Sequence, residues 1–134
     1  MKDVVCADTN ALSYVFNEHS LASFYQPLIA TNITAISFQT VLELRYGAYQ
    51  AAWGERRLDM LERFIASFII IHSEDSICTR CAHVLRLSKK QGQNIELGDA
   101  WIAATALELE LPLVTHDTRH FNFIPELKII SEQA

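Results

Sequence analysis

Short apolar runs that alternate with helical stretches constrain the fold of this chain more than any other feature. Five runs have the apolar or β-branched character of buried strands, at residues 4–8, 33–37, 68–72, 111–117 and 127–131. Segments with helical periodicity or capping residues separate them, at about 10–17, 21–30, 38–52, 55–66, 74–91 and 98–110. This alternation predicts an α/β fold, a three-layer α/β/α sandwich around a central, mainly parallel sheet.

Length and composition indicate a folded domain without a membrane segment. A chain of 134 residues fits one domain spanning 1–134, and its 50% hydrophobic content excludes a disordered class. The apolar runs are too short to cross a bilayer, so no membrane partner is expected. Residues 1–20 lack the pattern of a signal peptide.

The three cysteines indicate the compartment. Their odd number, with Cys6 inside the first predicted strand, favours a reducing, cytoplasmic environment over a disulfide framework. Cys78 and Cys81 form a lone CxxC pair. We interpret them as two small residues on one helix face, because a redox or zinc site needs a partner pair or a strand-to-helix context.

Four acids lie near the ends of predicted strands or the beginnings of predicted helices. Asp8 ends the first strand, and Asp117 lies at the end of the fourth. Glu43 lies about two turns into the helix after residues 33–37, and Asp99 lies in the first turn of its helix. Because elements that follow parallel strands begin at the carboxyl edge of the sheet, Asp8, Glu43 and Asp117 are expected on one rim. Asp99 joins them if its helix starts on that side.

Each acid alone has a simple structural explanation: a helix cap, a capping box, the helix dipole and an Asx-turn, respectively, for Asp8, Glu43, Asp99 and Asp117. A cluster of all four acids needs a further explanation, because two carboxylates ~4 Å apart repel by ~4 kcal/mol at an effective dielectric constant of ~20. Protonation or a bound cation relieves this repulsion. Oxygen ligands alone favour Mg²⁺ or Mn²⁺, so the pattern predicts a metal-dependent phosphoesterase.

The net charge of −5 argues against a broad basic surface for nucleic acid. Without the four acids, 12 of the 16 acidic residues remain against 11 basic ones, which is close to neutral. Charge therefore does not exclude a nuclease that holds phosphates through metal ions.

Four sequence blocks resemble the PIN-domain family, specifically the VapC-type toxin ribonucleases of prokaryotic toxin–antitoxin pairs. ADTNALSY resembles the opening strand with the first acid, and SFQTVLELRYGA resembles the segment with the second. GQNIELGDAWIAATAL resembles the third block, and LPLVTHDTRHF resembles the fourth. The blocks occur in order at suitable spacing, and the resemblance runs nearly from one end of the chain to the other.

The resemblance implies roles for particular residues. The catalytic, metal-binding acids would be Asp8, Glu43, Asp99 and Asp117. The groups that orient carboxylates or waters would be Thr9, Thr40 and Thr115. The pattern demands no role for Trp101 or His116.

The resemblance also implies an activity and partners. We expect a metal-dependent endoribonuclease in which water activated by Mg²⁺ or Mn²⁺ hydrolyses an RNA phosphodiester bond, leaving a 5′-phosphate and a 3′-hydroxyl. The expected partners are the RNA substrate, a cognate antitoxin protein that blocks the site, and a second copy of the chain in a homodimer.

Other residues near the acidic blocks have two interpretations each. Arg45 and Arg119 either contact RNA phosphates or the partner, or are solvated or ion-paired. His116 and His120 flank Asp117, and we interpret them as loop histidines rather than catalytic groups. The aromatic residues at 14, 16, 24 and 25 form either a partner surface or part of the core.

Three alternative functions remain open from the sequence. One is a PIN nuclease of RNA processing without an antitoxin. Another is a phosphotransferase of the haloacid dehalogenase type, but that family has a second Asp two residues after the first, where this chain has Asn10. The third is a non-catalytic binding module on the same fold, against which the retention of all four acids argues.

Overall fold

Five strands form one sheet in the computed structural model, which describes residues 2–133. The central strand, β1 (Val4–Ala7), lies between β2 (Ile33–Ser37) and β4 (Leu113–Val114), and the edges are β3 (Ile69–Ile71) and β5 (Ile129–Ile130). All four pairings are parallel, which confirms the predicted parallel sheet.

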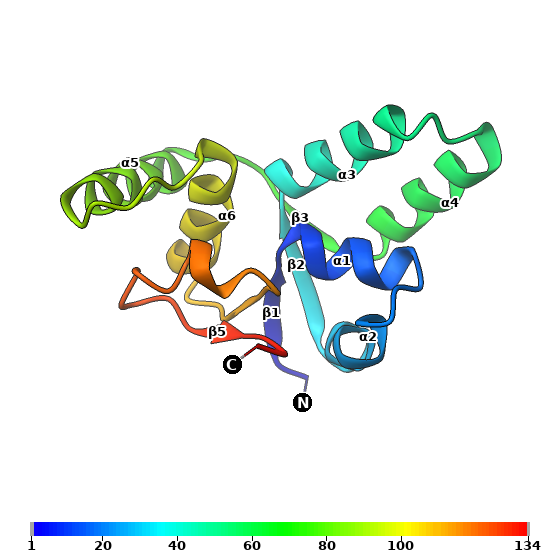
Figure 1. The fold of residues 1–134 in the computed structure, drawn as a ribbon, viewed down its shortest axis with the longest axis horizontal. Helices are drawn as coiled ribbons and strands as arrows, with labels where there is room; N and C mark the ends of the chain where they lie inside the picture. The colour runs from blue at the N-terminus through cyan, green and yellow to red at the C-terminus, as the bar shows by residue number, and fades with distance from the viewer. Residues whose placement is uncertain (1, 134) are drawn as a thin grey trace.

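Helices cover both faces of this sheet, as Figure 1 shows. One face carries α1 (Thr9–Phe16), α2 (Ala22–Thr31), α3 (Phe38–Gln50) and α4 (Glu55–Ala66). The other carries α5 (Asp75–Lys90) and α6 (Leu97–Glu108), and a short 3-10 helix, η1 (Thr118–His120), follows β4. The three-layer α/β/α architecture is therefore confirmed. None of the helices within residues 2–133 is long and apolar enough to cross a membrane.

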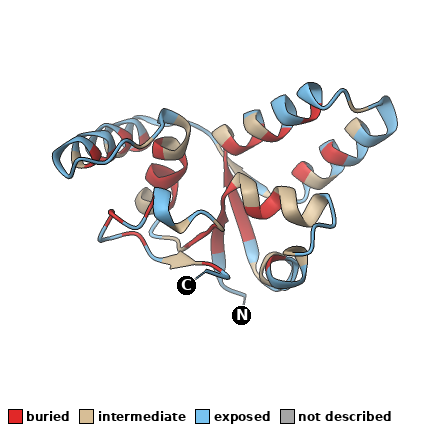
Figure 2. Cartoon of the chain, in the orientation of Figure 1, coloured by how far each residue is buried: buried red, intermediate tan, exposed pale blue. Residues whose placement is uncertain are grey.

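The core divides along the central strand because successive side chains of β1 face opposite sides of the sheet. Cys6 packs in a cluster with α5 and α6, whereas Ala7 packs with Leu12 and Ile36 on the face covered by α1–α4. Figure 2 shows the resulting buried centre, with exposed surfaces on the outer helices. All three cysteines are free thiols: Cys6 and Cys81 are buried, and Cys78 is exposed.

The boundaries differ from the prediction in two places that matter for the site. The helix predicted from about residue 10 begins at Thr9, because the side chain of Asp8 caps it. The strand predicted at 111–117 contains only Leu113–Val114. Beyond it the chain leaves the sheet, and the backbone amide of His116 bonds to the Asn10 side chain at 3.2 Å.

Candidate active site

Asp8 is a buried carboxylate at the carboxyl end of β1, and it is 4% exposed. Its Oδ1 accepts a hydrogen bond from the Thr9 amide at 2.7 Å. Its Oδ2 accepts one from the Thr115 hydroxyl at 2.8 Å. Donors from two different elements therefore fix both oxygens.

Burial raises the pKa of Asp8 from its ordinary value of 3.8 to about 7, because a carboxylate loses hydration in the interior. The negative charges of Asp99 and Glu43 raise this pKa further, whereas the hydrogen bonds from Thr115 and Thr9 lower it. Without a nearby positive charge, Asp8 is thus only partly ionised at neutral pH.

The Thr115 hydroxyl connects Asp8 to the segment that carries Asp117. Besides donating to Asp8, it accepts hydrogen bonds from the Asp117 amide at 3.1 Å and from Asn10 Nδ2 at 3.5 Å. A hydroxyl has one proton and two lone pairs. Since two N–H donors face its lone pairs, its proton is directed at Asp8.

Glu43 extends from α3 toward α1 and α6. Its Oε1 accepts a hydrogen bond from the Thr9 hydroxyl at 2.6 Å, and its Oε2 accepts one from Gln39 Nε2 at 2.9 Å. Thr40 is fully buried, with its hydroxyl 3.2 Å from that of Thr9. At Gly98 of α6, a Cβ atom would lie only 2.8 Å from both Gln39 Nε2 and Glu43 Oε2. Glycine at this position therefore leaves room for the ends of the Gln39 and Glu43 side chains.

Asp99 and Asp117 are linked by His120. The His120 Nδ1 lies 3.1 Å from Asp99 Oδ2 and 3.4 Å from Asp117 Oδ2. The side chain of Asp99 is 21% exposed, compared with 54% for Asp117 and 52% for His120. Burial raises the pKa of Asp99, His120 opposes that shift, and the charge of Glu43 adds to it. We call Asp8 and Glu43 the inner half of the site, and Asp99 and Asp117 the outer half.

The carboxylates of Asp8, Glu43 and Asp99 thus lie within electrostatic reach of one another, and Asp117 joins them through His120. As they stand, no three His, Cys, Asp or Glu side chains within residues 2–133 are arranged so that they could hold a metal ion. The donor set still fits a hard divalent cation in its chemistry, because it consists of carboxylates, one of which is too desolvated to ionise readily.

The two predicted RNA-contacting arginines lie in different surroundings. Arg45 forms hydrogen bonds of 3.0 and 2.8 Å with Glu62 on the exposed side of α3 and α4. Arg119 lines a small cavity together with Asp99 and His120. Only Arg119 therefore adjoins the acids.

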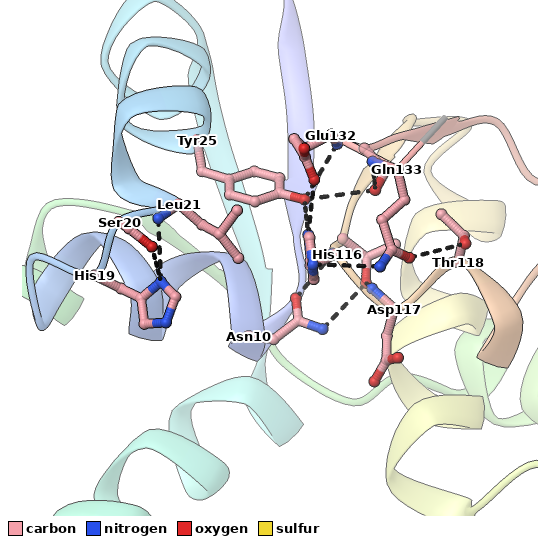
Figure 3. Close-up of polar contacts among 12 residues, drawn as sticks. Asn10, His19, Ser20, Leu21, Tyr25, His116, Asp117, Thr118, Glu132 and Gln133 are labelled. Carbon is pink, nitrogen blue, oxygen red and sulfur yellow. Dashed lines mark hydrogen bonds and ion pairs between the residues drawn. The ribbon is translucent and has the colours of Figure 1, made fainter.

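His116 belongs to a separate network, shown in Figure 3. Its Nδ1 lies 2.7 Å from the hydroxyl of the fully buried Tyr25, and its Nε2 lies 3.3 Å from Gln133 Nε2. The side chain of Asp117 points away from this network (Figure 3). His116 therefore connects the loop after β4 to α2 and to the residues that follow β5. Tyr25 is a core residue, whereas its neighbour Phe24 is 38% exposed.

Sequence reasoning did not place two residues in the site. His120 was interpreted as a loop histidine, whereas in the structure its ring lies between Asp99 and Asp117. The signal was its position three residues after Asp117, the spacing at which side chains meet along one helical turn. Gly98 carried none, because its importance comes from the packing of α3 against α6.

Comparisons with known proteins agree with this architecture. The family model described as PIN domain matches residues 5–126. Ribonuclease VapC2 of Rickettsia felis is 34% identical over 124 residues, covering 90% of this chain and 91% of the relative. Ribonuclease VapC1 of Haemophilus influenzae is 28% identical over 123 residues, covering 90% and 92%. A chain in the crystal structure of VapBC2 from Rickettsia felis, bound to a DNA fragment from their promoter, has a TM-score of 0.83 at 25% identity, over 96% of this chain and 98% of that one.

Proposed function

We propose that the acidic site of this chain hydrolyses RNA, and that the chain is the toxin of a toxin–antitoxin pair. The premise is its family: this chain belongs to the PIN-domain family and within it to the VapC-type ribonucleases. The observation that carries this proposal is Asp8: a carboxylate buried beside two further acids and held by two hydrogen bonds. Such a group is costly to ionise unless a cation joins it.

In this proposal Asp8, Glu43, Asp99 and Asp117 would hold Mg²⁺ or Mn²⁺. When bound, such a cation would supply positive charge near the phosphate oxygens and would lower the pKa of a water molecule. The raised pKa of Asp8 supports the proposal, because a cation would return this carboxyl to its ionised form.

The surrounding hydroxyl groups keep the acids in place. Thr115 orients Asp8 and, through the Asp117 amide, the loop that follows β4. Thr9 orients Glu43, and Thr40 supports Thr9. No side chain serves as the nucleophile: water attacks phosphorus in line with the departing 3′-oxygen, which leaves a 5′-phosphate and a 3′-hydroxyl. The protein contributes positioning and electrostatic stabilisation.

The expected protein partners are a cognate antitoxin that blocks the site and a second copy of the chain. The similar Rickettsia felis chain belongs to a VapBC2 complex, which supports the first of these. We place the protein in the cytoplasm, where RNA is accessible and where three free thiols remain reduced.

The test is cleavage of total RNA by the purified chain with Mg²⁺, Mn²⁺ or EDTA, followed by mapping of the new ends. We expect cleavage with either cation, none with EDTA, and 5′-phosphate ends. Asp8→Asn should abolish cleavage, whereas Asp59→Asn removes an exposed acid on α4 and should not. Cleavage that persists in EDTA, or in both Asp8→Asn and Asp99→Asn, would refute the proposal.

A further inference from the structure

A small cavity adjoins the outer half of the acidic site. It lies between residues 93–96, the first turn of α6 and residues 119–123, and its volume is about 140 Å³. Asp99 and His120 form part of its wall. The cavity therefore opens directly beside the groups proposed to act on the phosphodiester bond.

The cavity wall offers both hydrogen-bond donors and acceptors. The exposed amides of Gln93 and Asn94 provide both kinds, Glu96 accepts when ionised, and Arg119 only donates. None of the ion pairs among residues 2–133 engages Arg119, whereas Arg45 is paired. The ion pairs therefore leave the guanidinium of Arg119 available to a ligand.

This mixture suits a nucleic-acid base better than a phosphate. A phosphate carries negative charge and only accepts hydrogen bonds, so an ionised Glu96 would repel it. A base presents donors and acceptors along its edge and an apolar face, and the cavity also contains the apolar side chains of Ile95 and Phe123. Proteins that read single-stranded RNA bind unstacked bases in this way, with hydrogen bonds to the edge and stacking on arginine.

We propose that this cavity holds one RNA base next to the bond that is cut. Gln93, Asn94 and Glu96 bind the edge of the base, and the planar guanidinium of Arg119 covers its face. This inference rests on the proposed function, and it adds to that function a preference for one base at a fixed position beside the cut.

The experiment is cleavage of total RNA with Mn²⁺, with sequencing of the new 5′ ends. It compares the wild type, the double variant Gln93→Ala/Asn94→Ala, and Gln91→Ala as a control outside the cavity. We expect the wild type and the control to share a base preference at one flanking position. The double variant should cut at preferred sites about tenfold more slowly, a loss comparable to one or two hydrogen bonds, and cut elsewhere within about threefold of the wild type. Arg119→Lys should also weaken the preference, because it keeps the charge and loses the planar face.

The outcomes separate this inference from the proposed function. If the wild type cuts without a base preference, or if the folded double variant keeps the preference, this inference is overturned and the nuclease proposal stands. If the wild type cuts no RNA, the proposed function fails and the inference fails with it. Thermal denaturation of the double variant, and the agreement of Arg119→Lys, exclude a loss that comes from misfolding.

Discussion

The inner and outer halves of the acidic site differ in how their carboxylates are held. Asp8 and Glu43 receive hydrogen bonds from the hydroxyls of Thr115 and Thr9, which belong to the elements around the central strand. Asp99 and Asp117 share one half-exposed imidazole, that of His120. The half-exposed imidazole contact contributes little to stability and adjusts easily. The hydrogen bonds from the two hydroxyls, in contrast, fix the geometry of Asp8 and Glu43 before any ligand binds.

The largest expected effect of this difference is on catalysis. Asp8→Asn should lower RNA cleavage by at least about 100-fold, because it removes a rigidly held carboxylate from the proposed cation site. Asp117→Asn should lower it by about tenfold, because that acid is 54% exposed and free to adjust. Single-turnover cleavage rates measure both effects. Equal losses would remove the distinction between the two halves.

The next effect concerns pH in the absence of divalent cations. The folded chain binds a proton at Asp8 up to about pH 7, whereas the unfolded chain releases it near 3.8. The free energy of unfolding should therefore fall as pH rises from about 4 to 7, by up to roughly 4 kcal/mol, and level off above that range.

Urea denaturation in EDTA at about pH 5 and about pH 8 measures the part of this change that falls above pH 5, up to roughly 3 kcal/mol. Asp8→Asn should flatten the dependence, and Mn²⁺ should restore stability to the wild type at the higher pH. Stability that rises with pH over this interval would contradict the inner half as described.

A smaller effect is expected from the hydroxyl that holds Asp8. Thr115→Val keeps the shape of the side chain but leaves Asp8 Oδ2 without its donor, which should cost about 1–2 kcal/mol of stability and about tenfold in cleavage rate. Thr115→Ser keeps the hydroxyl and serves as the control. If serine and valine behave alike, the hydroxyl does not position Asp8.

The smallest effect is expected at the link of the outer half. His120→Ala should change the free energy of unfolding by less than about 0.5 kcal/mol, because the imidazole is 52% exposed. Cleavage should fall by less than tenfold. A larger loss of cleavage at unchanged stability would show that His120 contacts the substrate itself.

The sequence was sufficient for the order and direction of the elements, because apolar strands and capped helices are local patterns. It also predicted Asp8, Glu43 and Asp117 on one rim, since parallel strands bring their carboxyl ends to one edge of a sheet. Asp99 was expected there only if its helix started on that side, and in the structure it does lie within electrostatic reach of Asp8. The length of β4 could not be predicted. Its end depends on Asn10, more than 100 residues away, which binds the chain at Thr115 and His116.

Other features of the site depend on tertiary packing for the same reason. Nothing near Arg45 in the sequence shows that Glu62 of the next helix engages it. Nothing near His116 shows that its ring turns toward Tyr25 and away from the acids. The link between Asp99 and Asp117 through His120 likewise requires α6 and η1 to meet at one end of the sheet.

The missing side chain at Gly98 has a practical consequence. Alanine in place of glycine stabilises most helices by up to about 1 kcal/mol. Gly98→Ala is therefore an obvious substitution for increasing the stability of the protein. Here the added methyl group would meet the ends of the Gln39 and Glu43 side chains and displace them. We expect the Gly98→Ala protein to fold but to cleave RNA poorly. A bacterial expression host should therefore produce this variant at higher levels than the wild type.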